Sequence, residues 1–265
     1  MTRRKERPPT PQDELRRDLT SLKLDTMLAH LDVALEEAAT LEQGYSTFLA
    51  GLVGREVLAR AEAGAARRID AGKFPMTRTF DTFDWAFQPG LNVAQVKELQ
   101  SLRFVEQGRS VLLLGKPGTG KTHLSIAFGV LAAHRGYTVR FYTAPALLSE
   151  LLASLADNTT DRLVKRLARI DVLIIDDLRP VPQRAEYASL LFDLIEARYL
   201  RRPTILSSNV SVEKWGEILG NPALTAAMVD RLMEKAHVIN IRKGRSYRTE
   251  GPDASPERPS PESAE

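Results

Sequence analysis

The sequence predicts an α/β protein, in which helices flank a central parallel sheet and a small helical domain precedes it. From about residue 92, short aliphatic runs alternate with longer amphipathic segments, whereas residues 13–75 show only helical spacing of their apolar side chains. Continuous aliphatic strands separated by helix-length segments are typical of a parallel sheet that is covered on both faces. We therefore expect a helical N-terminal domain at 13–75, a linker at 76–91 and an α/β domain at 92–248.

In the helical domain, one stripe of leucines predicts the first helix. These leucines step by 4, 3 and 4 residues, which places them on one helix face: Leu24, Leu28, Leu31 and Leu35. Gly44 interrupts the pattern, and a second helix is predicted to start at Tyr45.

The linker at 76–91 contains four aromatic residues: Phe80, Phe83, Trp85 and Phe87. Aromatic side chains in a loop can stack on nucleic-acid bases. More often they fix a linker onto a neighbouring core, and we favour that interpretation.

The strands of the α/β domain are expected at the aliphatic runs 111–114, 139–142, 172–176, 204–208 and 238–241. The first four runs lie far enough apart for crossover helices between them, which is what parallel strands require.

Composition excludes several classes of protein. The chain of 265 residues is 43% hydrophobic and 27% charged, as in ordinary globular proteins, and it contains no cysteine. Disulfides, cysteine-ligated zinc and thiol catalysis are therefore excluded, and 4 scattered histidines do not favour a histidine-rich metal site. No apolar run approaches the length of a membrane span, and the basic start lacks the apolar core of a secretory signal, so we expect a cytoplasmic protein.

Both ends of the chain are rich in proline, serine and charge, and we expect 1–12 and 249–265 to be disordered. The C-terminal tail has five acidic residues and one arginine, so its own net charge is −4, whereas the net charge of the whole chain is +3. The remaining residues then carry +7. A basic body suits an acidic partner such as nucleic acid, although a solvated basic surface explains the charge equally well.

A phosphate-binding motif follows the strand at 111–114. It reads G-x-x-x-x-G-K-[ST] over Gly115, Lys116, Pro117, Gly118, Thr119, Gly120, Lys121 and Thr122. We expect these residues, with His123 directly after them, to bind the nucleotide. Backbone N–H groups of such a loop surround phosphate oxygens at the positive end of the following helix. We expect Lys121 to reach the β- and γ-phosphates of a nucleotide and the Thr122 hydroxyl to ligate Mg²⁺.

Two carboxylates follow the aliphatic residues of the strand at 172–176: Asp176 is its last residue and Asp177 comes directly after it. The first is positioned to hold Mg²⁺, and the second to polarise an attacking water, which favours hydrolysis over transfer to a small acceptor. Asn209 ends the next strand and could orient this water or touch the γ-phosphate, although asparagine is also a common turn residue. No Asn-Lys-x-Asp string is present, which argues against a guanine-specific GTPase.

With these motifs assembled, the chain resembles the IstB helper ATPases of insertion sequences, which are AAA+ proteins close to the DnaC-type helicase loaders. The resemblance runs from about Leu22 to Arg248. Besides the phosphate loop, it is carried by the strings at 135–141, 208–216, 230–232 and 244–248.

The resemblance implies an AAA+ fold and further roles for single residues. It makes Asn209 the sensor-I residue, Arg231 an arginine finger for a neighbouring subunit, and Arg248 a reader of the γ-phosphate within the subunit. By position alone, Arg231 is an ordinary salt-bridged surface residue, and Arg248 belongs to a basic cluster with Arg242, Lys243 and Arg245.

Two residues depart from the pattern of the family, which often has Asp-Glu followed by Leu-Gly at this point. Asp177 is one methylene shorter than glutamate, so we expect slower water polarisation. Arg179 replaces a glycine, and we expect the backbone there not to adopt a positive φ readily.

The resemblance implies ATP-dependent assembly of a homo-oligomer on double-stranded DNA and stimulation of a partner transposase. In the helical domain, Arg55, Arg60, Arg67, Arg68 and Lys73 are candidate contacts to DNA phosphates. A DnaC-type loader of a ring helicase is the alternative, because it has the same ATPase core. A small-molecule P-loop kinase is a third hypothesis, which the basic excess and the second aspartate disfavour.

Overall fold

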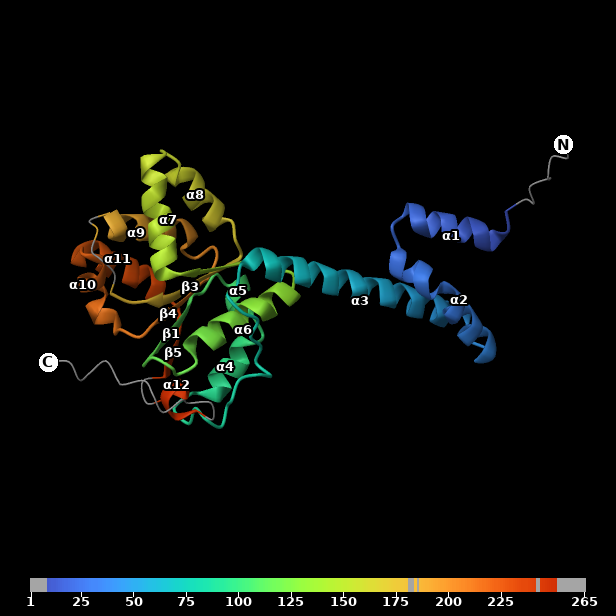
Figure 1. Ribbon diagram of the computed structural model, residues 1–265, viewed down its shortest axis with the longest axis horizontal. Helices are drawn as coiled ribbons and strands as arrows, with labels where there is room; N and C mark the ends of the chain where they lie inside the picture. Colours follow the sequence, from blue (N-terminus) through green and yellow to red (C-terminus); the bar gives the residue numbers. More distant parts are fainter. Residues whose placement is uncertain (1–8, 181–183, 185, 242–243, 252–265) are drawn as a thin grey trace. The chain divides into compact units, whose positions relative to one another are not determined.

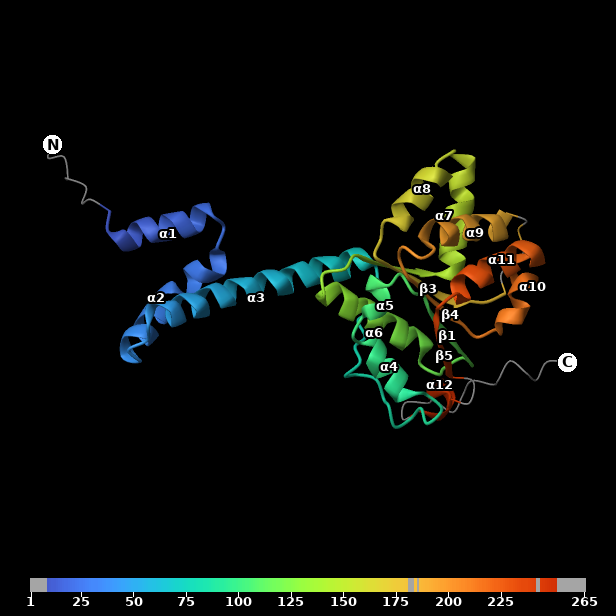
Figure 2. The same cartoon turned by 180° about the vertical axis from the view of Figure 1, so that it is seen from behind.

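The computed structural model of the protein describes residues 9–180, 184, 186–241 and 244–251 (Figures 1 and 2). The chain divides into two compact units, Met1–Ala65 and Ala66–Glu265. The division lies within a long helix and ten residues before the expected linker, because residues after Ala65 join the second unit. Ile69 packs against the core of that unit, and Arg68 Nε donates a hydrogen bond of 2.7 Å to the Ala133 carbonyl.

The N-terminal unit consists of α1 (Pro11–Ser21), α2 (Asp25–Thr40) and the first part of α3 (Tyr45–Gly72). Helix α1 begins two residues before the expected start of helical structure, because Thr10 and Asp13 form a capping box. The Asp13 N–H donates to Thr10 Oγ1 over 3.2 Å, and the Thr10 N–H donates to the Asp13 carboxylate over 2.9 Å. Residues 1–8 of the segment expected to be disordered lie outside the described residues.

A buried carboxylate fastens α3 to α2. Glu56 is only 6% exposed, and its Oε2 accepts hydrogen bonds from the N–H groups of Thr26 and Met27 in the first turn of α2. Arg60 Nε donates to the other oxygen over 2.7 Å. Burial alone would raise the pKa of Glu56, but these hydrogen bonds hold it below its usual value. The carboxylate therefore satisfies helix N–H groups that lack a partner within α2.

The second unit contains one five-stranded parallel sheet, with the order β2-β3-β4-β1-β5. Its strands lie where the aliphatic runs predicted them: β1 (Val111–Gly115), β2 (Val139–Thr143), β3 (Val172–Leu178), β4 (Thr204–Ser208) and β5 (His237–Ile241). Because the strands are parallel, their carboxyl ends meet at one edge of the sheet. The ends of β1, β4 and β3 are neighbours there.

Helices cover both faces of this sheet (Figures 1 and 2). One layer contains α4 (Val93–Leu99), α5 (Arg103–Glu106) and α6 (Lys121–His134). The other contains α7 (Ala144–Ala156), α8 (Thr160–Ala168), α9 (Glu186–Arg198), α10 (Trp215–Leu219) and α11 (Pro222–Met233), with a 3₁₀ turn at Val212–Lys214. Alternate residues of β1 point into the two layers, as Leu112 and Leu113 do. In the part of the chain that the structure describes, no helix is long and apolar enough to cross a membrane.

The aromatic segment 76–91 packs on α6. The Phe80 ring meets the Phe128 ring edge-on at 4.9 Å, and the Phe83 ring lies 4.9 Å from that of Trp85 and 5.1 Å from that of His123. This confirms the expectation for Phe80, Phe83 and Trp85, which pack on the core of the α/β unit, whereas the Phe87 ring lies 4.9 Å from that of Tyr247.

Candidate nucleotide site

The phosphate loop connects β1 to α6 at the carboxyl edge of the sheet. Gly118 and Gly120 have φ angles of 79° and 89°, a region that favours glycine. A Cβ atom at Gly120 would also lie 2.7 Å from Cε2 of Phe83, so this position lacks room for a side chain. Thr119 is fully buried and fixes the loop internally through a 2.8 Å hydrogen bond from its hydroxyl to the Lys116 carbonyl.

Lys121 bonds back to its own loop. Its Nζ donates to the carbonyl oxygens of Gly115 and Lys116, each over 2.8 Å. Burial lowers the pKa of Lys121 to about 8, while the charges of Asp176 and Asp177 act in the opposite direction. Charged phosphate oxygens accept stronger hydrogen bonds from an ammonium group than carbonyl oxygens do. A phosphate bound in the loop could therefore replace the two carbonyls as the partner of Lys121.

This lowered pKa predicts a pH dependence of ATP binding. Below pH 8 Lys121 already carries its charge, but above pH 8 the free protein loses it, and bound phosphates must draw the proton back. We expect the affinity for MgATP to fall about tenfold between pH 7 and pH 9, with proton uptake on binding at the higher pH. Calorimetry in buffers of different ionisation enthalpy measures both quantities. Lys121→Arg is the control, because its guanidinium stays charged and the slope should vanish.

Asp176 forms the centre of a polar network between three elements. Its Oδ2 accepts a hydrogen bond of 2.8 Å from Thr122 Oγ1 on α6, and its Oδ1 accepts one of 2.5 Å from Ser207 Oγ on β4. The residue is 4% exposed, and burial raises the pKa of its carboxyl group against the effect of these two hydrogen bonds. Ser207 was not recognised as a site residue from the sequence, where a serine at the end of a strand was its only signal.

The pair Thr122 and Asp176 fits a magnesium ion. The two side chains present a hydroxyl and a carboxylate oxygen side by side, and Mg²⁺ in nucleotide sites takes few protein ligands, with phosphates and water completing its shell. No group of three or more acidic, histidine or cysteine side chains that could hold a metal occurs among the described residues. A magnesium ion here would therefore depend on the nucleotide.

Asp177 has an unusual backbone conformation. Its φ is 60°, and the register of β3 on β4 shifts between Ile175 and Leu178. A bulge of this kind re-aims the side chain at the strand end. The expected difficulty at Arg179 is not observed, because the positive φ falls at Asp177 and Arg179 is not among the described residues with a positive φ. The Asp177 N–H donates to Ser207 Oγ over 2.9 Å, which fixes this conformation.

Asn209 and the C-terminal segment complete the edge around the loop. Asn209 directly follows β4, which lies between β1 and β3, and it is exposed. The short helix α12 (Tyr247–Glu250) begins with a 2.9 Å hydrogen bond from the Tyr247 N–H to the Gly118 carbonyl. Arg248, in this helix, is close enough for its charge to lower the pKa of Lys121. Arg242 and Lys243 of the cluster noted above lie outside the described residues.

His123 faces the aromatic segment. Its Nε2 lies 2.8 Å from the Thr79 carbonyl and 3.3 Å from Thr82 Oγ1, and burial lowers the pKa of its imidazole. These contacts give His123 a role in attaching the segment 76–91 to α6.

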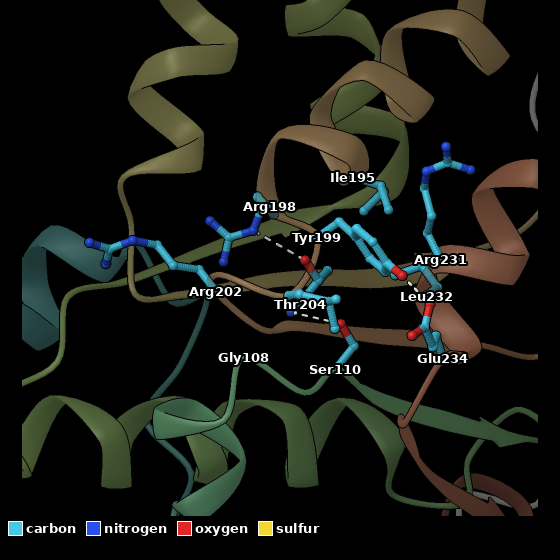
Figure 3. A pocket seen from close by; sticks show the side chains of 11 residues that line it. Gly108, Ser110, Ile195, Arg198, Tyr199, Arg202, Thr204, Arg231, Leu232 and Glu234 are labelled. Carbon is cyan, nitrogen blue, oxygen red and sulfur yellow. Dashed lines mark hydrogen bonds between the residues drawn. The ribbon is translucent and has the colours of Figure 1, made fainter.

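Arg231 belongs to the opposite edge of the sheet. It pairs with Glu196 of α9, its guanidinium lies 4.9 Å from the Phe192 ring, and it lines a small pocket with Ser110 and Thr204, at the start of β1 and β4. Figure 3 shows its side chain extending away from the strands. The phosphate loop follows the other end of β1, so Arg231 and this loop lie at opposite ends of the strand.

Arg198, in the same pocket, has a structural role. It is 1% exposed and donates to Thr204 Oγ1 (Figure 3). Its guanidinium also donates to the carbonyls of Leu167, Ile170 and Pro203. Burial lowers the pKa of this guanidinium to about 9, so it remains a cation at neutral pH. It ties the end of α8 to the start of β4.

The site geometry agrees with the match to a known family. Residues 17–253 match the model of the family described as IstB-like ATP binding protein. The chain belongs to this family. An IstB-like relative described as an ATP-binding protein of insertion sequence IS21 from Pseudomonas aeruginosa is 38% identical over 87% of this chain and 86% of its own. A relative in insertion sequence IS5376 of Geobacillus stearothermophilus is 36% identical over 86% and 90%.

Solved structures show the same fold as this IstB-like chain. The crystal structure of DnaI has a TM-score of 0.53 at 23% identity, over 62% of this chain and 90% of that one. DnaA from Aquifex aeolicus, bound to AMPPCP, has a TM-score of 0.52 over 64% and 51%. The predicted AAA+ fold, with a parallel sheet between helical layers and a helical N-terminal unit, is confirmed.

Proposed function

We propose that this IstB-like protein is an ATPase that assembles on duplex DNA and assists the transposase of an insertion sequence in selecting and using a target. The observation that carries the ATPase part is the meeting of Lys121, Thr122 and Asp176 at the end of β1 and β3, with Asp177 beside them. The insertion-sequence part rests on relatives that match most of the chain. We expect the protein to act in the cytoplasm.

Each site residue has a role in this proposal. Lys121 and the loop N–H groups bind the phosphates, and Thr122 and Asp176 hold Mg²⁺, which bridges phosphate oxygens and neutralises their charge. Asp177 accepts the proton of the attacking water, and Asn209 orients that water. Arg248 contacts the γ-phosphate within the subunit, whereas Arg231 serves a neighbour.

A basic face on α8 supports DNA binding. Arg162, Lys165, Arg166 and Arg169 are exposed and spaced as one helix face, and they line a hollow of about 670 Å³ with Asn158 and Asp161. Leu163 and Leu167 anchor the opposite face in the core. Guanidinium and ammonium groups in such a row suit the phosphates of a duplex.

Within the part of the chain that the structure describes, only some of the basic residues in and directly after α3 are free of side-chain hydrogen bonds and so able to contact DNA phosphates. Arg60 Nη2 donates to the Lys23 carbonyl over 2.5 Å and Arg68 bonds to Ala133, whereas Arg67 and Lys73 are exposed. Arg67 and Lys73 therefore remain the better DNA candidates in this region.

An uncovered apolar face on α3 supports self-association. Ala50, Gly54, Val57 and Ala61 are exposed and recur at 4, 3 and 4 residues, the spacing of a helix-packing seam. Val53 and Leu58 beside them are 41% and 61% exposed. A helix with apolar residues on this much of its surface is normally covered by another helix.

The DNA proposal is tested by removing charge from the basic face of α8. The triple variant Arg162→Gln, Lys165→Gln, Arg169→Gln should bind duplex DNA roughly 10- to 100-fold more weakly at moderate salt, and the slope of log affinity against log salt should fall by about three. The matched control changes three exposed basic residues of the other layer, Lys97, Arg103 and Arg135, to glutamine.

If the triple variant and its control lose the same affinity for duplex DNA, the loss comes from the change in net charge and not from the face of α8. Salt-independent binding by the wild type would contradict phosphate contacts altogether. A pull-down with a replicative helicase, run beside the DNA titration, distinguishes the loader alternative: capture of the helicase without duplex binding would favour it.

A further inference from the structure

An ion pair occupies the carboxylate that the proposed reaction needs. Arg179 Nε lies 3.0 Å from Asp177 Oδ2, and the two side chains are 57% and 43% exposed. Asp177 lies in the bulge of β3 and Arg179 directly follows the strand, so the bend at the strand end brings the two side chains together. The pair therefore depends on the backbone conformation that the pairing of β3 with β4 imposes at Asp177.

The backbone around this pair is fixed on both sides. Ser207 Oγ accepts from the Asp177 N–H over 2.9 Å, and Ser208 Oγ donates to the Leu178 carbonyl over 2.6 Å. Leu178 between them is fully buried. The backbone of Asp177 and Leu178 is therefore held in place, and a change in the pairing of the two exposed side chains needs no movement of β3.

We infer that Arg179 restrains Asp177 and lowers the basal rate of ATP hydrolysis; this inference rests on the proposed role of Asp177 as the base. Arg179 Nε occupies the Asp177 carboxylate oxygen at 3.0 Å, so an attacking water must displace it before that oxygen can accept a proton. Arg179 is a positioning residue in this account, since it acts through Asp177. An anionic partner that drew Arg179 away would release the base.

The expected effect is modest, because exposed ion pairs are weak. Arg179→Gln and Arg179→Gly should raise kcat about two- to fivefold and leave KM for ATP unchanged, while Arg179→Lys stays near the wild type. At saturating MgATP and without DNA, added salt should raise wild-type kcat by screening the pair, and should not raise that of Arg179→Gln. Arg16→Gln, which removes an exposed ion pair with Asp32 in the N-terminal unit, should behave as the wild type.

An unchanged or lower kcat in Arg179→Gln would overturn the inference, and a lower one would mean that Arg179 stabilises the transition state. The double variant Asp177→Asn, Arg179→Gln should show no gain over Asp177→Asn alone, since both changes act on one carboxylate. If Asp177→Asn keeps full turnover, the proposed base is wrong. If it is inactive and Arg179→Gln equals the wild type, only the restraint fails.

Discussion

Asp177→Asn should bind MgATP with wild-type affinity and hydrolyse it 10² to 10⁴ times more slowly, the range that loss of a general base produces. The amide keeps the shape of the side chain and cannot take the proton of the attacking water. The Mg²⁺ ligands Thr122 and Asp176 are untouched, and the backbone contact of Asp177 to Ser207 does not involve its side chain. Single-turnover hydrolysis and nucleotide binding are measured on the same preparation.

Two further variants separate the loss of ATP binding from the loss of hydrolysis. Lys121→Ala should lose ATP binding itself, because the loop then lacks the ammonium group now held between the Gly115 and Lys116 carbonyls. Asp177→Glu lengthens the base by one methylene and should keep or raise the wild-type rate. Normal turnover by Asp177→Asn would assign the proton to another acceptor.

The sequence predicts the sheet well because its signals are local. β1 and β3 contain continuous aliphatic runs, and the shorter apolar stretches of β2, β4 and β5 are likewise read from neighbouring residues in the chain. The phosphate loop is predictable for the same reason, since Gly118 and Gly120 supply the positive φ angles that its path requires.

The parts that the sequence did not predict depend on tertiary contacts. Ser207 reaches Asp176 only because β4 pairs with β3, 31 residues away in the chain. The positive φ at Asp177 arises from the shifted register of that pairing, so a rule about glycine at position 179 could not locate it. The boundary between the units depends on which helix residues pack on which core, and helical periodicity is the same on both sides of Ala65.

The placement of the C-terminal segment on the phosphate loop is likewise a tertiary feature. A Cβ at Gly118 would clash with Ser246, and the Gln88 amide donates 2.6 Å to the Arg245 carbonyl, which holds residues 244–248 against the linker and the loop. The resemblance pointed to this string, but no pattern within it predicted the contact. The roles of Asn209, Arg231 and Arg248 remain predictions.

Arg231→Ala should bind ATP normally and hydrolyse it about 10³-fold or more slowly, because an arginine on the γ-phosphate contributes this much in related chemistry. We expect the effect to act between subunits, since Arg231 lies near the start of β1 and β4, whereas the phosphate loop follows the end of β1. Glu196→Gln is the matched control: it breaks the same surface pair, leaves Arg231 in place, and should keep the ATPase rate.

A mixture of Arg231→Ala and Lys121→Ala proteins should regain activity that neither has alone. In a randomly mixed assembly, about a quarter of the interfaces join an intact phosphate loop to an intact arginine, which sets the expected recovery. Such complementation requires that ATP lie between two subunits, and binding then favours assembly because only the assembled state gains the arginine contact. Wild-type hydrolysis by Arg231→Ala under assembling conditions would leave Arg231 as the partner of Glu196 and nothing more. Inactivity of Glu196→Gln together with failed complementation would assign the loss to the packing of α11 on α9.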